Sequence, residues 1–133
     1  YIEIDYIQSL YWLTMRLLFV CVGNSCRSQM AEGIAKSLGH QADSAGTHPA
    51  SSIAKNAEIV LQSRGINTQG MKPKHVDLFS ADNYDKVISM GCGVHCPVMR
   101  IDYDWGLEDP VGKELSLYYS TADEIEKRIM QLK

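Results

Sequence analysis

The sequence predicts an α/β fold of three layers, in which helices lie on both sides of a central four-stranded parallel sheet. The length of 133 residues is that of a single domain. Short apolar runs that end at loop residues alternate with segments whose apolar side chains recur every three or four positions. The first pattern is typical of buried parallel strands, and the second of amphipathic helices. Strands that are joined through helices run parallel in one sheet.

The first unit of this pattern is a strand, a tight loop and a helix. Residues 16–21 (RLLFVC) form a mostly apolar run that is typical of a buried strand. A loop follows, and then Met30, Ile34 and Leu38 recur at four-residue steps, which predicts one apolar face of a helix. We expect this helix to end at Gly39, because glycine commonly follows the last helical residue.

Two further helices and three further strands are expected. The second helix begins with Ser52 as its N-terminal cap and stops at Gly65. The last helix is predicted from the capping pair Thr121 and Glu124. The remaining strands are expected at residues 41–45, 86–90 and within 98–105.

Three candidate functional segments follow predicted strands. They are Cys21, the loop at residues 91–97 (GCGVHCP) and the Asp109-Pro110 loop. In parallel sheets, ligands bind beyond the carboxyl ends of the strands. We therefore expect these segments to converge at one edge of the sheet.

Composition and charge restrict the function. The net charge of −3 disfavours a nucleic-acid partner, and no apolar run reaches the ~18 residues of a membrane span. Four cysteines are too few for a secreted scaffold built on disulfides, so we expect a cytoplasmic protein with reduced thiols. We also expect a monomer. Residues 1–14 are either an additional element or sequence upstream of a natural start at Met15. We treat them as an N-terminal extension of unknown role, before a single domain at 15–133.

Residues 21–27 (CVGNSCR) carry the strongest chemical signal. In a loop between a strand and a helix N-terminus, backbone N–H groups and the helix dipole attract an anion. Arg27 supplies a planar fork for two oxygens of a tetrahedral oxyanion. The N–H groups and Ser28 are expected to favour the thiolate of Cys21, the candidate nucleophile. The residues expected to bind the oxyanion are Val22, Gly23, Asn24, Ser25, Cys26 and Arg27.

These residues also have simpler interpretations. Cys21 would then be a buried apolar cysteine before an ordinary turn. We interpret Cys26 as a structural thiol, and we expect Asn24 to brace the loop through side-chain hydrogen bonds. The buried strand before the C-x5-R spacing and the helix after it favour the catalytic interpretation of Cys21.

The segment CVGNSCRSQMAEG at residues 21–33 closely resembles the active-site signature of the thioredoxin-coupled arsenate reductases built on the low-molecular-weight protein tyrosine phosphatase fold. SAGTHP at 44–49 resembles the exit of that family's second strand, and DWGLEDPVGK at 104–113 its late Asp-Pro loop. The Ser-Gln-Met after Arg27 is more similar to the reductases than to the phosphatases, which more often have Ser-Pro. The resemblance runs from about Met15 to the C-terminus.

The resemblance implies a mechanism. Cys21 attacks arsenate to form a covalent adduct, and Asp109 is the acid that protonates the leaving oxygen. Reduction of As(V) to As(III) needs two electrons, so a second thiol must attack the adduct and a third can then move the disulfide. We assign these steps to Cys92 and Cys96, in that order. Without the resemblance, Asp109 before Pro110 would be a common turn residue.

Cys92 and Cys96 have two other interpretations. They are zinc ligands together with His95, or they are ordinary thiols. A disulfide between them requires a loop or an unwound helix, because residues four apart in a helix hold their Cβ atoms ~5–6 Å apart. The best-known thioredoxin-linked members have a cysteine directly after the third strand, where this chain has Gly91. A sub-group with an MGCG-x-x-CP loop is similar to this chain, and the departure leaves the order of attack and the electron donor open.

The expected cofactors are an external thiol reductant, thioredoxin or glutaredoxin, with nothing tightly bound and no catalytic metal. In some relatives a potassium ion lies beside the loop, near residues that match Asn24, Glu32 and Ser44. The favoured function is arsenate reduction, with weak phosphatase activity because phosphate and arsenate have nearly the same shape. The alternatives are a phosphatase that hydrolyses phosphomonoesters through a phosphocysteine at Cys21, and a non-enzymatic oxyanion-binding or redox-sensing module.

Overall fold

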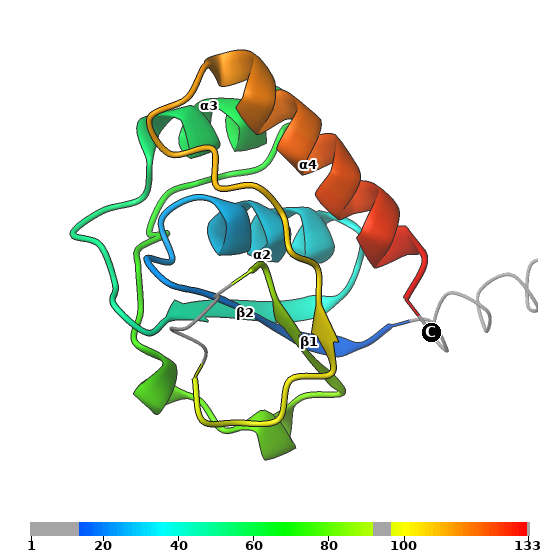
Figure 1. Cartoon of the computed structure of the whole chain (residues 1–133). Helices are drawn as coiled ribbons and strands as arrows, with labels where there is room; N and C mark the ends of the chain where they lie inside the picture. The colour runs from blue at the N-terminus through cyan, green and yellow to red at the C-terminus, as the bar shows by residue number, and fades with distance from the viewer. Residues whose placement is uncertain (1–13, 92–96, 133) are drawn as a thin grey trace, which may run out of the picture.

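A computed structural model describes residues 14–91 and 97–132. Four strands form one parallel sheet in the order β2-β1-β3-β4 (Figure 1). The predicted α/β class with a central four-stranded parallel sheet is therefore confirmed. The strands are β1 (Arg16–Cys21), β2 (Gln41–Gly46), β3 (Lys86–Ser89) and β4 (Tyr103–Asp104), and the α-helices are α2 (Arg27–Ser37), α3 (Lys55–Ser63) and α4 (Leu115–Met130).

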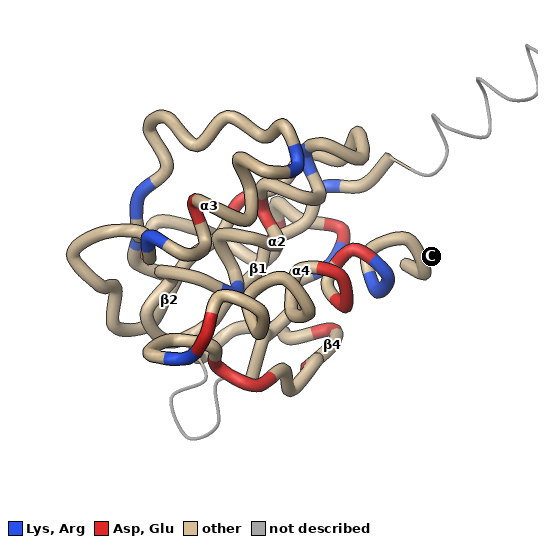
Figure 2. Tube along the Cα trace, turned by 90° about the horizontal axis from the view of Figure 1, so that it is seen from above, with Lys and Arg blue, Asp and Glu red and all other residues tan. Residues whose placement is uncertain are grey.

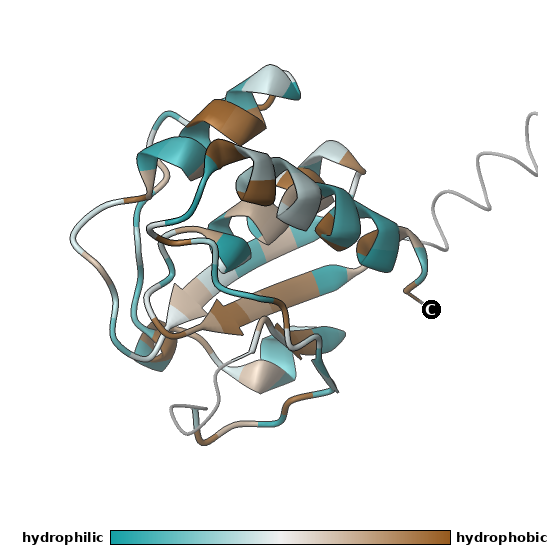
Figure 3. Cartoon of the chain, turned by 45° about the horizontal axis from the view of Figure 1, so that its top comes forward, coloured by the Kyte–Doolittle hydropathy of each residue, from teal (hydrophilic) through white to brown (hydrophobic). Residues whose placement is uncertain are grey.

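The helices α2, α3 and α4 lie on the same face of the sheet, with α2 directly over the strands (Figure 1). On this face Phe19 of β1 is paired in register with Ile88 of β3, and both are fully buried. Met30 and Ile34 of α2 belong to the same core cluster. In Figure 3 the strands beneath the helices carry a concentration of apolar residues. The four-residue spacing in α2 thus predicts its buried face correctly, and that face anchors the loop that precedes the helix.

Two short 3-10 helices, Val76–Leu78 and Ala81–Asn83, cover the opposite face together with segment 97–101. The three predicted layers are present, but in the described part of the chain this layer contains no α-helix. The connection between α3 and β3 contains Gly65, Gly70 and Pro73, which favour turns over a continuous helix. Its apolar residues pack instead as single turns against the sheet. The core on this face consists of Leu18, Val20, Ala45, Val76 and Val87.

Two predicted helix starts are wrong. α3 begins after Ala54, which has no side-chain capping bond, so Ser52 is not the cap. α4 begins after Glu114, about two turns before the expected cap at Thr121. Thr121 lies inside α4, where its hydroxyl donates to a backbone carbonyl of the preceding turn. A Thr-x-x-Glu spacing therefore also occurs within a helix, because residues three apart share one helix face.

The first helix ends as predicted. Its last residue is Ser37, and Gly39 adopts a φ of 95° that favours glycine. Leu38, expected on the apolar face, is 39% exposed because it lies at the end of the helix. Within residues 14–91 and 97–132, none of the helices has the length and apolar character needed to cross a membrane.

Candidate active site

The turn between β1 and α2 holds Cys21 at its base. Cys21 is the last residue of β1, and its side chain is buried. Within the turn, Asn24 adopts the left-handed conformation with φ 50°, which asparagine tolerates better than most residues. The N–H of Asn24 donates to Cys21 Sγ at 3.1 Å. A donor directed at the sulfur stabilises its negatively charged form.

A chain of buried side chains lies behind the sulfur. Ser28 Oγ is 2.8 Å from Cys21 Sγ. Asn24 Nδ2 donates to Ser28 Oγ at 2.7 Å, which leaves the hydroxyl proton of Ser28 available for the sulfur. Gln29 Nε2 in turn donates to Asn24 Oδ1 at 3.2 Å. Asn24 thus braces the loop as the sequence predicts, whereas the contribution of Gln29 is recognised only in the structure.

The carboxyl end of β2 supports the outside of the turn. The N–H groups of Thr47 and His48 donate to the carbonyls of Cys21 and Val22. Gly46 makes this close approach possible, because a Cβ at that position would collide with the Val22 carbonyl oxygen. The sequence alone does not indicate this role of Gly46, although Gly46 lies within the SAGTHP segment.

Arg27, the first residue of α2, closes the site. Its Nη1 donates to the backbone carbonyls of Met90 at 3.1 Å, Gly91 at 3.3 Å and Leu107 at 2.8 Å. In the described part of the chain, its buried Nε has no hydrogen-bond partner. One end of the guanidinium is therefore held by three carbonyls, and the Nε edge remains available for the oxygens of an anion.

Asp109 lies at the mouth of the turn, in the segment after β4. Its Oδ2 is 3.8 Å from Arg27 Nη2, and its side chain is 54% exposed. Its Oδ1 accepts hydrogen bonds from the N–H of Val111 at 3.0 Å and from Cys26 Sγ at 3.6 Å. The expected convergence of Cys21, the start of the 91–97 loop and Asp109 is thus observed. A cleft of about 370 Å³ is lined by Cys21, Val22, Gly23, Asn24, Ser25, Cys26, Arg27, Asp109 and Val111.

The surroundings of Cys26 oppose the thiolate form that a nucleophilic cysteine needs. Burial and then the negative charge of Asp109 raise the pKa of Cys26 to about 12. At neutral pH it is therefore a protonated thiol, in agreement with the interpretation of Cys26 as a structural residue. Cys92 and Cys96, together with His95 of the zinc alternative, lie outside the described residues.

A buried acidic residue lies beneath the loop. Burial raises the pKa of Glu32, but hydrogen bonds from Ser44 and Lys36 and the charge of Lys74 outweigh it and hold this pKa below its usual range. Ser44 Oγ donates to Oε1 at 2.6 Å, and Lys74 Nζ lies 3.4 Å from the same oxygen. Lys36 Nζ donates to Oε2 at 2.9 Å.

The resemblance to the reductases made a potassium ion possible beside Asn24, Glu32 and Ser44, and the contacts of these residues do not fit that ion. Both Glu32 oxygens already accept from ammonium groups, and the Ser44 hydroxyl donates its proton to Oε1. Asn24 Oδ1 accepts from Gln29 Nε2 and from the N–H of Lys74. A potassium ion here would compete with these donors and would meet the positive charge of Lys74.

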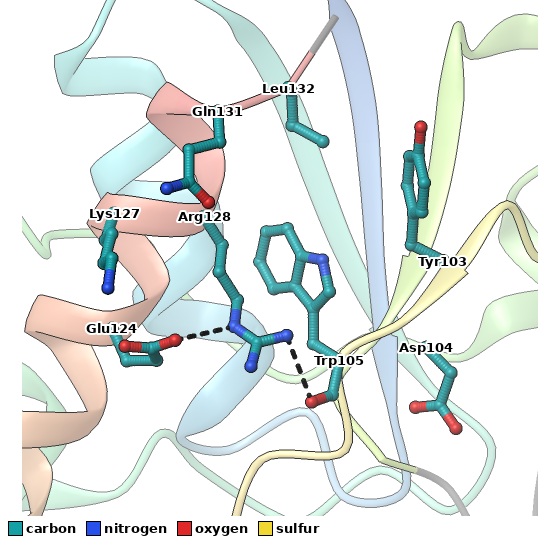
Figure 4. Close-up of a pocket in the computed structure, with 8 residues that line it drawn as sticks. All are labelled: Tyr103, Asp104, Trp105, Glu124, Lys127, Arg128, Gln131 and Leu132. Atoms are coloured by element: carbon teal, nitrogen blue, oxygen red, sulfur yellow. Dashed lines mark hydrogen bonds and ion pairs between the residues drawn. The ribbon is translucent and has the colours of Figure 1, made fainter.

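Elsewhere in residues 14–91 and 97–132, charge does not define a second anion site. Acidic and basic residues are interspersed along the trace (Figure 2). A larger hollow of about 590 Å³ lies between α4 and the end of β4 (Figure 4). There Arg128 pairs with Glu124 at 2.9 Å and stacks over the Trp105 ring, so its charge is already compensated. No cysteine, serine, threonine or histidine lines this hollow.

Comparison with known proteins agrees with this architecture. The low molecular weight phosphotyrosine protein phosphatase family matches residues 16–133. The chain is 38% identical over 125 residues to a protein of Synechocystis sp. named glutaredoxin arsenate reductase. This alignment covers 88% of this chain and 95% of that protein.

Solved structures include members of both functional classes. A structure described as an arsenate reductase in the phosphate binding state has a TM-score of 0.78 and 37% identity, over 86% of this chain and 93% of the other. A low molecular weight protein tyrosine phosphatase from T. tengcongensis has a TM-score of 0.68 and 33% identity, over 88% of this chain and 96% of the other. With its parallel sheet and its Cys21–Arg27 loop, this chain belongs to the low molecular weight phosphotyrosine protein phosphatase family.

Proposed function

We propose that this protein reduces arsenate to arsenite, with Cys21 as the nucleophile. The observation that carries the proposal is the setting of Cys21 Sγ. It receives a backbone N–H from Asn24 and contacts Ser28, at the base of a cleft that Arg27 and Asp109 also line. Relatives named arsenate reductases, which align over most of the chain, support this choice of oxyanion.

In the first step the Cys21 thiolate attacks arsenic, and an S–As bond forms as an As–O bond breaks. Asp109 gives its proton to the departing hydroxide, which leaves as water. The N–H groups of the 22–27 loop that do not contact the sulfur, together with the Nε edge of Arg27, hold the remaining arsenate oxygens. Ser28 holds the sulfur and stabilises its charge before the attack.

The reduction itself uses the cysteines of the 91–97 loop. Cys92 attacks Cys21 Sγ, the S–As bond breaks with its electron pair on arsenic, and arsenite leaves. Cys96 then attacks Cys92 and releases Cys21, which leaves a Cys92–Cys96 disulfide. An external dithiol protein, a glutaredoxin or a thioredoxin, supplies two electrons to reduce that disulfide. The cycle needs a compartment that keeps thiols reduced, which favours the cytoplasm, and it needs only one copy of the chain.

Phosphomonoester hydrolysis is the second candidate function. The likeness to the T. tengcongensis phosphatase favours it, and it needs only Cys21, Arg27 and Asp109. Water would then release phosphate from a phosphocysteine, and the cysteines of the 91–97 loop would have no role.

One variant separates the two functions. We expect Cys92→Ser to stop arsenate-dependent NADPH consumption in assays coupled to thioredoxin or to glutaredoxin with glutathione. The same variant should hydrolyse an aryl phosphate at the wild-type rate. Continued arsenate turnover by Cys92→Ser would contradict the relay. A wild-type protein that hydrolyses the aryl phosphate but consumes no NADPH with either donor would favour the phosphatase.

A further inference from the structure

A buried ionic cluster lies beneath the oxyanion loop, and the proposed reaction does not use it. Glu32 projects from α2, Ser44 from β2, and Lys74 from the segment that leads into the first 3-10 helix. The carboxylate of Glu32 is 7% exposed, and the Lys74 side chain is 22% exposed. A carboxylate this deeply buried must be paired, because an isolated buried charge is strongly destabilising.

Lys74 connects three parts of the structure. Its Nζ lies 3.4 Å from Glu32 Oε1 and donates to the Lys72 carbonyl at 3.3 Å. Its N–H donates to Asn24 Oδ1 at 2.9 Å. Its carbonyl accepts from the N–H of Gly46 at 2.8 Å. The ammonium therefore contacts one carboxylate oxygen and one carbonyl oxygen, which are ligands that alkali cations also use.

The connection continues to the nucleophile. Asn24 contacts Ser28 through its amide, and both Asn24 and Ser28 contact Cys21 Sγ. A shift of the Lys74 backbone would therefore change the orientation of Asn24 and the hydrogen bond that it donates to the sulfur. Glu32 and Arg27 lie on the same helix, α2, so the position of Glu32 is also coupled to that of the Arg27 guanidinium.

We propose that Lys74 is a positioning residue that supplies, from within the chain, the positive charge at Glu32 that a bound alkali cation would otherwise have to supply. The oxyanion loop then keeps its shape without potassium. The Lys74 ammonium neutralises Glu32, and the backbone N–H of Lys74 holds the Asn24 side chain. One residue therefore sets both the charge balance and the geometry of the loop. The link to catalysis rests on the proposed function of the loop, whereas the effect on stability does not.

The first test uses the unmodified protein. Its melting temperature is measured in KCl, NaCl and tetramethylammonium chloride at equal ionic strength. We expect the three values to agree within about 1 °C, because no cation-selective site contributes to folding. A melting temperature raised selectively by potassium would overturn the proposal.

The second test compares two substitutions. Lys74→Met removes the ammonium but keeps most of the apolar stem, and Lys72→Met is the matched control at an exposed position two residues away. In tetramethylammonium chloride we expect Lys74→Met to melt about 5 °C below the control. KCl should recover much of this loss in Lys74→Met and leave Lys72→Met unchanged. Equal melting temperatures of the two variants, or a loss that potassium does not reduce, would overturn the assignment.

Binding of inorganic phosphate tests the link to the loop. We expect calorimetry to give the same affinity for wild-type protein in all three salts, and a several-fold weaker affinity for Lys74→Met that potassium restores. If Lys74→Met binds phosphate as tightly as the control without potassium, Lys74 does not position the loop. Absence of phosphate binding by the wild type would instead contradict the proposed function and leave the melting experiments to decide the role of Lys74.

Discussion

Cys21 and Cys26 begin and end the same turn, and each is 3% exposed, yet their surroundings are opposite. Cys21 Sγ receives the N–H of Asn24 and contacts Ser28 Oγ. Cys26 Sγ instead donates to Asp109, and burial followed by that negative charge raises the pKa of Cys26 to about 12. Burial alone therefore does not decide whether a cysteine reacts. The partner at the sulfur also contributes, because donors favour a thiolate and a carboxylate opposes it.

The largest effect is expected when the Cys21 sulfur is replaced by oxygen. We expect Cys21→Ser to abolish both arsenate reduction and aryl phosphate hydrolysis, because a serine hydroxyl is not ionised at neutral pH. Circular dichroism should show an unchanged fold. Measurable turnover of either substrate by Cys21→Ser would exclude Cys21 as the nucleophile.

Asp109 contacts Cys26 and Arg27 rather than the Cys21 sulfur, so its substitution separates proton donation from attack. We expect Asp109→Asn to lower the rate of aryl phosphate hydrolysis by about 10²-fold, the usual contribution of a general acid. Alkylation of Cys21 by iodoacetamide should proceed at close to the wild-type rate. A substrate with a good leaving group should lose less activity than unsubstituted phenyl phosphate. An equal loss for both substrates would contradict the role of Asp109 as acid.

Ser28→Ala removes one donor from the Cys21 sulfur. We expect a fall of about 10-fold in the rate of the first chemical step, which corresponds to one hydrogen bond to a charged group. The rate at which iodoacetamide alkylates Cys21 at neutral pH should fall, because the thiolate is less stabilised. Ser120→Ala is a matched control on an exposed part of α4. A Ser28→Ala protein with an unchanged alkylation profile would show that the serine does not act on the sulfur.

The smallest effect is expected at Cys26. Because its raised pKa of about 12 keeps the thiol protonated, Cys26 should resist iodoacetamide from pH 7 to pH 10 in the Cys21→Ser background. Its reactivity should rise only as the pH approaches that value. We expect Cys26→Ser to change turnover by less than about threefold. Mass spectrometry that finds rapid alkylation of Cys26 at pH 8 would remove the contrast between the two cysteines.

Sequence patterns identified the elements better than their boundaries. The helix after the loop was recognised from Met30 and Ile34, which are fully buried in the same core. The two helix starts based on Ser52 and Thr121 were wrong, because a hydroxyl residue before an apolar run occurs both at caps and within helices. Apolar periodicity is repeated along a helix, whereas a cap depends on one residue.

The sequence indicates the residues of the candidate site but not the contacts that support them. The sequence indicates Cys21, Arg27 and Ser28 because their spacing within one loop and one helix turn places them together. It does not reveal Gly46, whose lack of a Cβ admits the Val22 carbonyl. Nor does it reveal that Leu107 holds the Arg27 guanidinium.

Sequence patterns therefore suffice to predict the succession of strands and helices along the chain and the residues of the oxyanion loop. Both depend on interactions between near neighbours in the chain, which leave periodic or closely spaced patterns. The contacts that hold the loop in shape are visible only in the folded chain, since Arg27 contacts Leu107 across 80 residues and Lys74 contacts Glu32 across 42. Contacts over such separations form when the sheet brings distant segments together, and the local sequence carries no pattern that records them.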